Sequence, residues 1–330
     1  MKKKIIDKIK SFKFKNLKVF ILKNKNFLEI ILLVFAIAIA VGIFGFSSLG
    51  KNVSNFVVEK NCSNTVVQND DAGANDIKDE EFVSENYYKL KPDLVISVMA
   101  DSQAIFERFK LIGDFAKKME EQETKPDFVI EAGDFIENRT KAGGGRQPRE
   151  DGLADFKKAD ALLAYEPRYH VIGNHEMLSF NKKDYKDLTG FDSYYSFIAK
   201  GYQIIVLDAM YWQSSEKDVD PEKQKPGAYT GYIPSKEKIW LEERLKENDR
   251  NIIFIHHPIY NLTNSVEIEK LLKKYQDDVI LISNGHKNRA RTFTFAGTHY
   301  ADIPSLYHQK QYMIISVKNK IAEVEFLNLY

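Results

Sequence analysis

The sequence predicts an α/β fold followed by a run of strands, and three observations support this prediction. In the first half of the region from Lys89 onward, short apolar runs alternate with amphipathic stretches, which favours parallel βαβ units. Toward the C-terminus, apolar runs follow one another without a helix between them, which favours an antiparallel edge or a second sheet. The 330 residues are 44% hydrophobic and 29% charged, a globular composition that suits one large domain or two small ones.

The predicted elements all lie after residue 89, and no internal repeat is visible. The predicted strands are short apolar runs: Leu94–Met99, Phe128–Glu131, Tyr169–Ile172, Ser193–Ile198, Gln203–Leu207, Ile252–His256, Val279–Ser283, Thr292–Phe295, Tyr312–Val317 and Ile321–Phe326. The predicted helices are amphipathic stretches: Ala104–Glu121, Leu153–Ala164, Lys236–Glu247 and Val266–Tyr275.

The N-terminal region has the pattern of a membrane anchor. Residues 1–26 form a leader with ten lysines and one aspartate, and the anchor is predicted at residues 27–49. Its centre, Ile30–Phe46, is an uncharged run of 17 residues, which as a helix covers about 25 Å of the ~30 Å hydrocarbon core. Because lysines favour the cytoplasmic side, we expect one pass through a bacterial cell membrane, with the N-terminus inside and the C-terminal domain outside.

This apolar run has two other interpretations. A cleaved signal peptide would have an unusually long charged leader, and no A-x-A cleavage site follows the run. A buried core helix disagrees with a run that is hydrophobic on all sides and has strongly polar flanks. The anchor is therefore the favoured interpretation, with the cleaved signal as its alternative.

Residues 50–88 are predicted to be an acidic, flexible spacer. They contain eight acidic residues and three lysines and show no sustained periodicity. The single cysteine of the chain, Cys62, lies here, so an intramolecular disulfide is ruled out. From Lys89 to the C-terminus the charges nearly balance, so no basic face suggests a nucleic-acid partner.

Polar residues directly follow five of the predicted strands. The strand ends read "MADSQ", "EAGDF", "VIGNHE", "FIHHP" and "SNGHKN". In open α/β sheets ligands bind at the carboxyl ends of strands, which we call the rim. Carboxylates, amides and imidazoles that converge there suit divalent metals. Gly133, Gly173 and Gly285 each precede a polar residue at a sharp exit from a strand, where a positive φ or a close backbone approach is expected.

The ordered set "DSQ … GD … GNHE … H … GHKN" resembles the calcineurin-like metallophosphoesterase family. The resemblance implies a two-sheet β-sandwich flanked by helices in αββα layers, which would form the catalytic domain at residues 89–330. It also implies a two-metal site that hydrolyses phosphoesters. A second metal would be held by residues that are all present here, namely Asp134, Asn174, His256 and His286.

The first metal site implied by the resemblance departs from the family pattern. Its four positions are occupied here by Asp101, Gln103, Asp134 and Asn288. Gln103 and Asn288 stand where histidines are usual, so only oxygen ligands remain. Oxygen ligands suit Mn²⁺, Mg²⁺ or Ca²⁺, whereas imidazoles suit zinc and iron. We therefore expect two divalent metals, a weak Mn²⁺-like first site and a firmer Fe, Zn or Mn second site, or only one metal bound.

Two catalytic residues are implied by the same resemblance. His175 matches the non-ligand histidine that protonates the leaving oxygen or stabilises the transition state, and Glu176 is expected to orient its ring. The alternative is that His175 only caps a loop. Between the neighbouring histidines, strand alternation lets one face the rim, and the family position favours His256 over His257.

Other residues have weaker functional signals. The glycine-rich insertion "NRTKAGGGRQPRED" contains Arg139, Arg146 and Arg149, which could bind a substrate phosphate or belong to a solvated loop. Tyr211 and Trp212 could stack on a substrate or cover the edge of the core.

Three histidines outside these motifs are expected to be ordinary packed or surface residues. They are His170, His299 and His308. His299 in "GTHYAD" follows the last motif and could reach the rim.

The sequence is compatible with three functions. The favoured one is a membrane-anchored phosphoesterase acting on a phosphorylated small molecule or an envelope component. The second is a metal-binding pseudoenzyme or scaffold, because two histidines are replaced. The third is a two-metal hydrolase of a bond other than a phosphoester.

Overall fold

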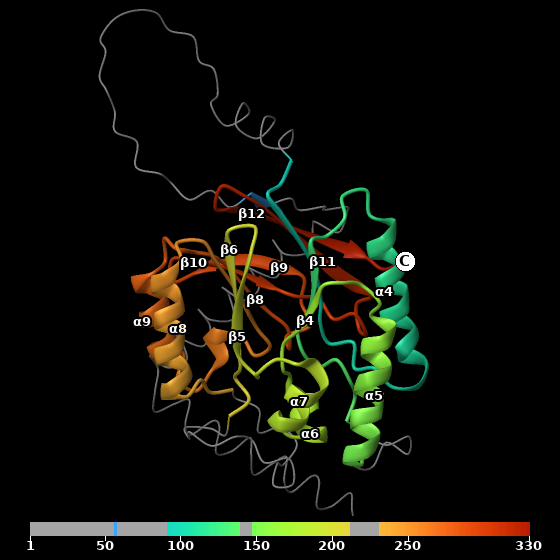
Figure 1. The fold of residues 1–330 in the computed structure, drawn as a ribbon. Coiled ribbons are helices and arrows are strands. Elements are labelled where there is room, and N and C mark those ends of the chain that lie inside the picture. The colour runs from blue at the N-terminus through green and yellow to red at the C-terminus, as the bar shows by residue number, and fades with distance from the viewer. Residues whose placement is uncertain (1–55, 58–90, 139–146, 212–230) are drawn as a thin grey trace, which may run out of the picture. The chain divides into compact units, whose positions relative to one another are not determined.

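The computed structural model describes residues 56–57, 91–138, 147–211 and 231–330 (Figure 1). Two sheets of six strands each form the centre of this part of the chain. The first sheet has the order β1-β12-β11-β2-β3-β4, with β1 Phe56–Val57, β12 Ile321–Asn328, β11 Gln311–Lys318, β2 Leu94–Met99, β3 Phe128–Glu131 and β4 Arg168–His170. The second has the order β5-β6-β7-β8-β10-β9, with β5 Tyr195–Ala199, β6 Tyr202–Leu207, β7 Asn251–Ile255, β8 Val279–Asn284, β10 Thr298–Asp302 and β9 Arg291–Phe295.

Both sheets are mixed, and each combines a block of parallel strands with strands that pair antiparallel. In the first sheet β2, β3 and β4 are parallel, and β11 and β12 continue it antiparallel to them and to each other. In the second, β6, β7, β8 and β10 are parallel, while β5 and β9 pair antiparallel at the two edges. This arrangement confirms the expected α/β organisation, because the parallel pairs β2–β3, β3–β4, β6–β7 and β7–β8 each have a helix between their strands in the sequence. The parallel pair β8–β10 differs, since strand β9 lies between its members.

The helices cover the outer faces of the sandwich. α4 (Phe109–Glu121) and α5 (Arg149–Leu162) lie on one side, and α8 (Ser235–Glu247) and α9 (Ser265–Lys274) lie on the other (Figure 1). Short turns of 3₁₀-helix, η1 (Phe106–Arg108) and η2 (Ile259–Asn261), precede α4 and α9. α6 (Asn174–Ser179) and α7 (Lys182–Thr189) lie at one end of the sheets, at the lower edge of the figure. The αββα layers expected from the sequence are therefore present.

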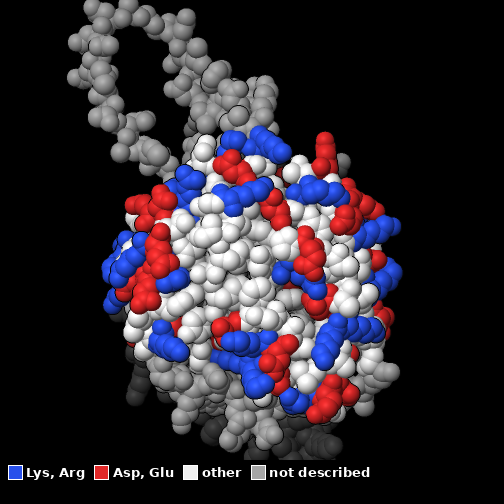
Figure 2. Space-filling model, in the orientation of Figure 1, with Lys and Arg blue, Asp and Glu red and all other residues white. Residues whose placement is uncertain are grey.

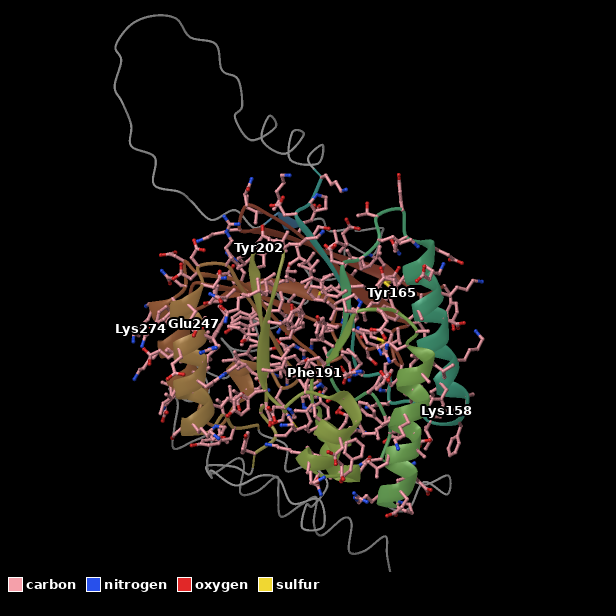
Figure 3. All side chains as sticks on the ribbon, in the orientation of Figure 1. Lys158, Tyr165, Phe191, Tyr202, Glu247 and Lys274 are labelled. Carbon is pink, nitrogen blue, oxygen red and sulfur yellow. The ribbon has the colours of Figure 1, made fainter. Side chains whose placement is uncertain are left out.

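The space between the sheets is filled by apolar side chains from both of them (Figure 3). Ile96 and Ile130 of the first sheet belong to the same buried cluster as Ile204 and Phe254 of the second. The other faces of the sheets pack against the helices, so strands such as β2 and β7 are buried along their whole length. Burial on both faces explains why these strands are continuous apolar runs rather than alternating ones.

On the face shown in Figure 2, basic and acidic side chains are intermixed.

Several predicted elements differ from the structure. The predicted helix Ala104–Glu121 begins later, because Phe106 has a φ of 52° and only Phe109–Glu121 is α-helical. Strand β10 and the short helices α6 and α7 were not predicted, since their sequences mix polar and apolar residues without a sustained period. Residues 50–88 were predicted to be a spacer, yet Phe56–Val57 within them pairs antiparallel with β12.

The predicted leader and anchor lie outside the described residues. Within the described ranges, no helix has the length and apolar character needed to cross a bilayer. The anchor at residues 27–49 therefore stays a prediction.

Candidate metal centre

The five polar strand ends of the sequence meet around the carboxylate of Asp134. Asp134 follows β3, and its Oδ2 lies 3.2 Å from Nε2 of His256, which follows β7. Its Oδ1 accepts a hydrogen bond of 2.9 Å from the backbone N–H of His175 in α6. Asp101, after β2, accepts a 3.0 Å hydrogen bond from the backbone N–H of His286, after β8. Adjacent strands of both sheets thus deliver these groups to one rim.

The backbone at this rim is held in an uncommon conformation. Five residues predicted as metal ligands have a positive φ, namely Asp101 (51°), Gln103 (43°), Asp134 (54°), His286 (65°) and Asn288 (50°). A left-handed conformation costs free energy for residues with a Cβ, and such strain clusters at functional sites. The strain is held in place by hydrogen bonds such as Asp101 N–H to Gly133 O and Gln103 N–H to Asp134 O. The ligand side chains are therefore aimed by the loops rather than by the strands.

Two glycines permit the close contact of these loops. Gly133 has a φ of 91°, and a Cβ there would lie 2.5 Å from Nδ1 of His256. A Cβ on Gly173 would collide with the backbone nitrogen of Asp134. The expected need for a positive φ or a close approach is confirmed at both positions.

His256 provides a direct test of whether this site fits a cation. Its Nδ1 lies 2.9 Å from the carbonyl oxygen of Ala132, which can only accept, so Nδ1 carries the proton. The other nitrogen, Nε2, is buried without a hydrogen-bond partner and faces a carboxylate. Two electron-pair donors that face each other in a buried site fit a cation between them. Without one, burial lowers the pKa of His256 but the Asp134 carboxylate outweighs it and raises the pKa to about 10.

Two amide oxygens also fit a cation, because they are buried without a hydrogen-bond partner. Oδ1 of Asn174 and Oδ1 of Asn288 are both buried and have no hydrogen-bond partner. Carbonyl oxygens of this kind are suitable ligands for hard divalent cations. The amide nitrogen of Gln103 lies 3.5 Å from Nε2 of His175, so this side chain also points into the centre. The residues present therefore fit the two metals that the sequence implied, including the amides that replace histidines.

The carboxylates of the centre are electrostatically coupled. Burial raises the pKa of Asp101 to about 7, with only partial relief from His256. Burial acts on Asp134 in the same direction, but His256 and His175 outweigh it and hold the pKa of Asp134 well below its usual value. Asp134 is therefore the permanent negative charge of the site, as a ligand shared by two cations requires.

His257 lies closer to the centre than strand alternation suggests. Ligand atoms of His256, His257 and His286 all lie within 4.8 Å of one another, and the rings of His257 and His286 are stacked at 4.1 Å. The expectation that His257 faces away from the rim is wrong, because β7 ends at Ile255 and alternation no longer applies. His256 is nevertheless the histidine in contact with Asp134.

Glu176 does not orient the His175 ring, so this expectation is corrected. The Glu176 carboxylate accepts hydrogen bonds from the backbone N–H groups of Gly173 (2.9 Å), Asp134 (3.0 Å) and Ile136 (3.2 Å). Its position at the start of α6 lets it bind the glycine turn and the aspartate loop together. Glu176 is therefore a positioning residue for Asp134.

The carboxylate beside His175 is Glu137, which sequence reasoning missed. Glu137 Oε1 lies 3.2 Å from Nδ1 of His175, and Glu137 Oε2 lies 3.2 Å from Nη1 of Arg108. The only signal in the sequence was its place three residues after Asp134 in "GDFIE". Burial lowers the pKa of His175, but Asp134 and Glu137 outweigh it and raise the pKa to about 9. The two carboxylates therefore favour the protonated form of the ring.

Of the three arginines expected to bind a phosphate, Arg149 lies within the described residues. Arg139 and Arg146 lie outside the described residues. Arg149 begins α5 and forms a bidentate ion pair with the carboxylate of Asp184, with Nε to Oδ2 at 2.9 Å. Since its guanidinium is committed to that pair, the phosphate-binding role expected for Arg149 is not supported by its contacts.

The three histidines outside the motifs are packed or surface residues, as expected from the sequence. His170 is buried between Glu131 (3.2 Å) and Asp160 (3.1 Å), and Glu131 in turn accepts the N–H of Gly133. His299 Nδ1 lies 3.0 Å from the hydroxyl of Thr294 on the edge strand. His308 is exposed, and its ring lies beside the ring of Tyr307. Trp212 lies outside the described residues, and Tyr211 contacts Lys182 through its ring face.

An open cavity elsewhere contains none of these groups. It has a volume of about 700 Å³ and is lined by residues such as Gly201, Asn248 and Tyr275. Asn248 precedes β7, so this cavity lies at the amino ends of the strands. Ligand binding in α/β sheets is expected at the opposite, carboxyl ends.

The fold is an αββα sandwich, and residues at one rim of it form a candidate site for divalent metals. The calcineurin-like phosphoesterase family matches residues 94–288, more than half of the chain. The protein therefore belongs to the calcineurin-like phosphoesterases, as its motifs indicated, and is a phosphoester hydrolase.

The chain is similar to solved structures, and one of them supports the fold. A dimetal phosphatase from Danio rerio has a TM-score of 0.57 and 18% identity, over 72% of this chain and 98% of that chain. GAP50, the anchor in the inner membrane complex of Plasmodium, has a TM-score of 0.49 and 14% identity, over 72% and 84% of the two chains. No protein of curated function matches the sequence.

Proposed function

We propose that this protein is a membrane-anchored, metal-dependent phosphoesterase that hydrolyses a phosphomonoester or phosphodiester of a small molecule or an envelope component. The observation that carries the chemistry is the line of groups from Glu137 through His175 to Asp134. It holds an imidazolium beside the candidate metal ligands. The anchor is supported by the apolar run Ile30–Phe46 alone, and the extracytoplasmic location by the lysines before it.

His175 is the proposed general acid. Its Nδ1 faces the Glu137 carboxylate, so Nε2 is the nitrogen that points toward the reacting group, 3.7 Å from Asp134 Oδ2. As water adds to phosphorus and the ester P–O bond breaks, the Nε2 proton passes to the leaving oxygen. Glu137 keeps the ring oriented during this transfer.

Divalent metals are the proposed cofactors, and when bound they supply Lewis acidity to the phosphoryl group and lower the pKa of water. Asp134, Asn174, His256 and His286 would hold the firmer ion, with Fe, Zn or Mn as the candidate metals. Asp101, Gln103, Asp134 and Asn288 would hold the weaker one, with Mn²⁺ preferred because every ligand is an oxygen.

The catalytic proposal is tested with His175→Ala. We expect turnover of an alkyl phosphate to fall ~10²–10⁴-fold, and turnover of 4-nitrophenyl phosphate to fall far less, because a good leaving group needs little protonation. An equal loss on both substrates would argue against His175 as the acid. Absence of turnover by the unchanged protein with added Mn²⁺ would favour a metal-binding scaffold.

The anchoring proposal is tested with Cys62, the only thiol of the chain. A membrane-impermeant maleimide added to intact cells should label Cys62, because the residue is expected outside, a short distance beyond the anchor. Labelling only after lysis contradicts the proposed topology. A mature N-terminus after Phe46 would replace the anchor with a cleaved signal.

A further inference from the structure

Beside the metal centre, three basic side chains gather around one aromatic ring. The guanidinium carbon of Arg108 lies 3.7 Å from the centroid of the Tyr307 ring, and Nζ of Lys310 lies 4.8 Å from it. The His308 ring lies 4.5 Å from the same ring, centroid to centroid. Arg108 belongs to η1, and the other residues belong to the loop between β10 and β11. We call Arg108, Tyr307, His308 and Lys310 the basic cluster.

The basic cluster is joined directly to the catalytic groups. Nη1 of Arg108 contacts Glu137, whose other carboxylate oxygen lies against His175, and it also donates to the backbone oxygen of Gln103 at 3.3 Å. The loop of the cluster is fixed to the first ligand, because Ser305 Oγ donates to the backbone oxygen of Asp101 at 2.9 Å. The cluster therefore lies on the His175 side of the centre, one side chain away from it.

The charge of the basic cluster is poorly neutralised. In the described part of the chain, Arg149 and Arg291 each pair with a carboxylate that no histidine shares, namely Asp184 and Asp302. Arg108 shares Glu137 with His175, while Lys310 donates to the backbone oxygen of Tyr307. Burial and the nearby Arg108 lower the pKa of both Lys310 and His308.

The described residues give the basic cluster one carboxylate, Glu137, which contacts Arg108 and is shared with His175. Two cationic side chains, Arg108 and Lys310, near one shared carboxylate leave an excess of positive charge that favours an anion. The Arg108 guanidinium lies over the face of the Tyr307 ring, which holds it in place. Phosphate and carboxylate groups are the anions that arginine and lysine bind best.

We propose that the basic cluster binds a second anionic group of the substrate, located on its leaving-group side. The side is assigned by His175, because the group that donates a proton to the leaving oxygen must lie next to it. The substrate class is therefore a phosphoester whose leaving group has a further phosphate or carboxylate. This inference depends on the proposed phosphoesterase function and specifies its substrate.

The test uses a matched pair of substrates. Phenyl phosphate has a leaving group without charge, and 4-(phosphonomethyl)phenyl phosphate has the same leaving group with a phosphonate that cannot be hydrolysed. We expect the full-length protein with Mn²⁺ to have a KM for the phosphonate substrate about tenfold lower, because one additional charged contact is made. Equal KM values for the two substrates would overturn the proposal.

The variant Lys310→Gln tests whether the basic cluster is responsible for the lower KM of the phosphonate substrate. It removes the charge, keeps an N–H donor, and lies outside the catalytic groups. The KM of the phosphonate substrate should rise about five- to tenfold, while kcat and the kinetics of phenyl phosphate stay unchanged. Lys310→Arg should restore the low KM. An equal change on both substrates would indicate a structural role and overturn the proposal.

Lys318→Gln is the matched control. Lys318 lies at the other end of β11 and also donates to a backbone oxygen, that of Lys91, at 2.6 Å. It should leave the KM ratio unchanged. If phenyl phosphate is not hydrolysed at all, the phosphoesterase function fails; if both substrates are hydrolysed and Lys310→Gln affects them alike, only the basic cluster proposal fails.

Discussion

The two halves of the metal centre share Asp134 but are built from different ligands. The second half has two imidazoles, His256 and His286, with Asp134 and Asn174. The first half has Asp101, the shared Asp134 and two amides, Gln103 and Asn288. In the first half all four expected ligands have a positive φ, whereas in the second half Asp134 and His286 do and Asn174 and His256 do not, so the halves differ in backbone conformation as well as in chemistry.

This comparison indicates that amides can occupy ligand positions where imidazoles are usual while the loop keeps a similar backbone conformation. Asn288 has a positive φ like His286, and its Oδ1 is buried without a partner, as is Nε2 of His256. Asn288 therefore has an oxygen without a hydrogen-bond partner, and we expect this oxygen to act as a metal ligand. The change from imidazole to amide is expected to alter which metal binds and how firmly, while keeping the geometry.

The largest expected effect comes from the residue common to both halves. Asp134→Asn should reduce phosphoesterase activity by more than about 10⁴-fold, because it weakens both halves at once and removes the charge that faces His256 and His175. Circular dichroism should remain unchanged. Asp187→Asn on the surface of α7 is the control, and a similar loss there would show that the assay reports stability.

The next effect separates the halves. His256→Ala should remove the metal that survives dialysis and lower activity ~10²–10³-fold, since it is a buried ligand of the firmer half. Asn288→Ala should leave that metal in place and lower activity about tenfold, mostly restored by excess Mn²⁺. Metal content measured by mass spectrometry decides between them. Equal metal loss in both variants would contradict the division into a firm and a weak half.

A third variant exchanges the chemistry of the weak half. Asn288→His should raise its affinity for zinc about 10- to 100-fold and lower the need for added Mn²⁺, because imidazole suits zinc better than an amide does. Titration of the metal-free protein with Zn²⁺ measures this directly. If neither the metal stoichiometry nor the Mn²⁺ dependence changes, Asn288 is not a ligand position.

The smallest effect concerns the support that both halves share. His170 bridges Glu131 and Asp160, and Glu131 holds the Gly133 turn that leads to Asp134. Burial lowers the pKa of His170, but the two carboxylates outweigh it and raise the pKa from 6.5 to about 9. The protonated form is thus favoured by folding, so this stability is complete below pH 6.5 and is lost as the pH rises through about 9.

The expected loss is about 3 kcal/mol at most across this range. Thermal unfolding at pH 6.5 and pH 9.5 should therefore differ by several degrees in the unchanged protein. In His170→Gln the difference should shrink. A His170→Gln protein with an unchanged pH dependence would show that His170 does not support the turn in this way.

The sequence by itself determined the fold class and identified the candidate metal ligands. Strands such as Leu94–Met99 and Phe128–Glu131 were predicted with the observed bounds, because strands buried on both faces are continuous apolar runs with sharp polar ends. Asp134, Asn174, His256 and His286 were found because motif order and strand ends together place them at one rim. Both signals are local along the chain.

Only the tertiary structure decided which side chains contact one another across those loops. Sequence reasoning gave His175 the neighbouring Glu176 as its partner, but the chain turns Glu176 toward three backbone N–H groups and brings Glu137 to the ring. The basic cluster likewise joins η1 to a loop almost 200 residues later. Such contacts depend on left-handed turns and on packing between distant segments, and neither leaves a periodic pattern in the sequence.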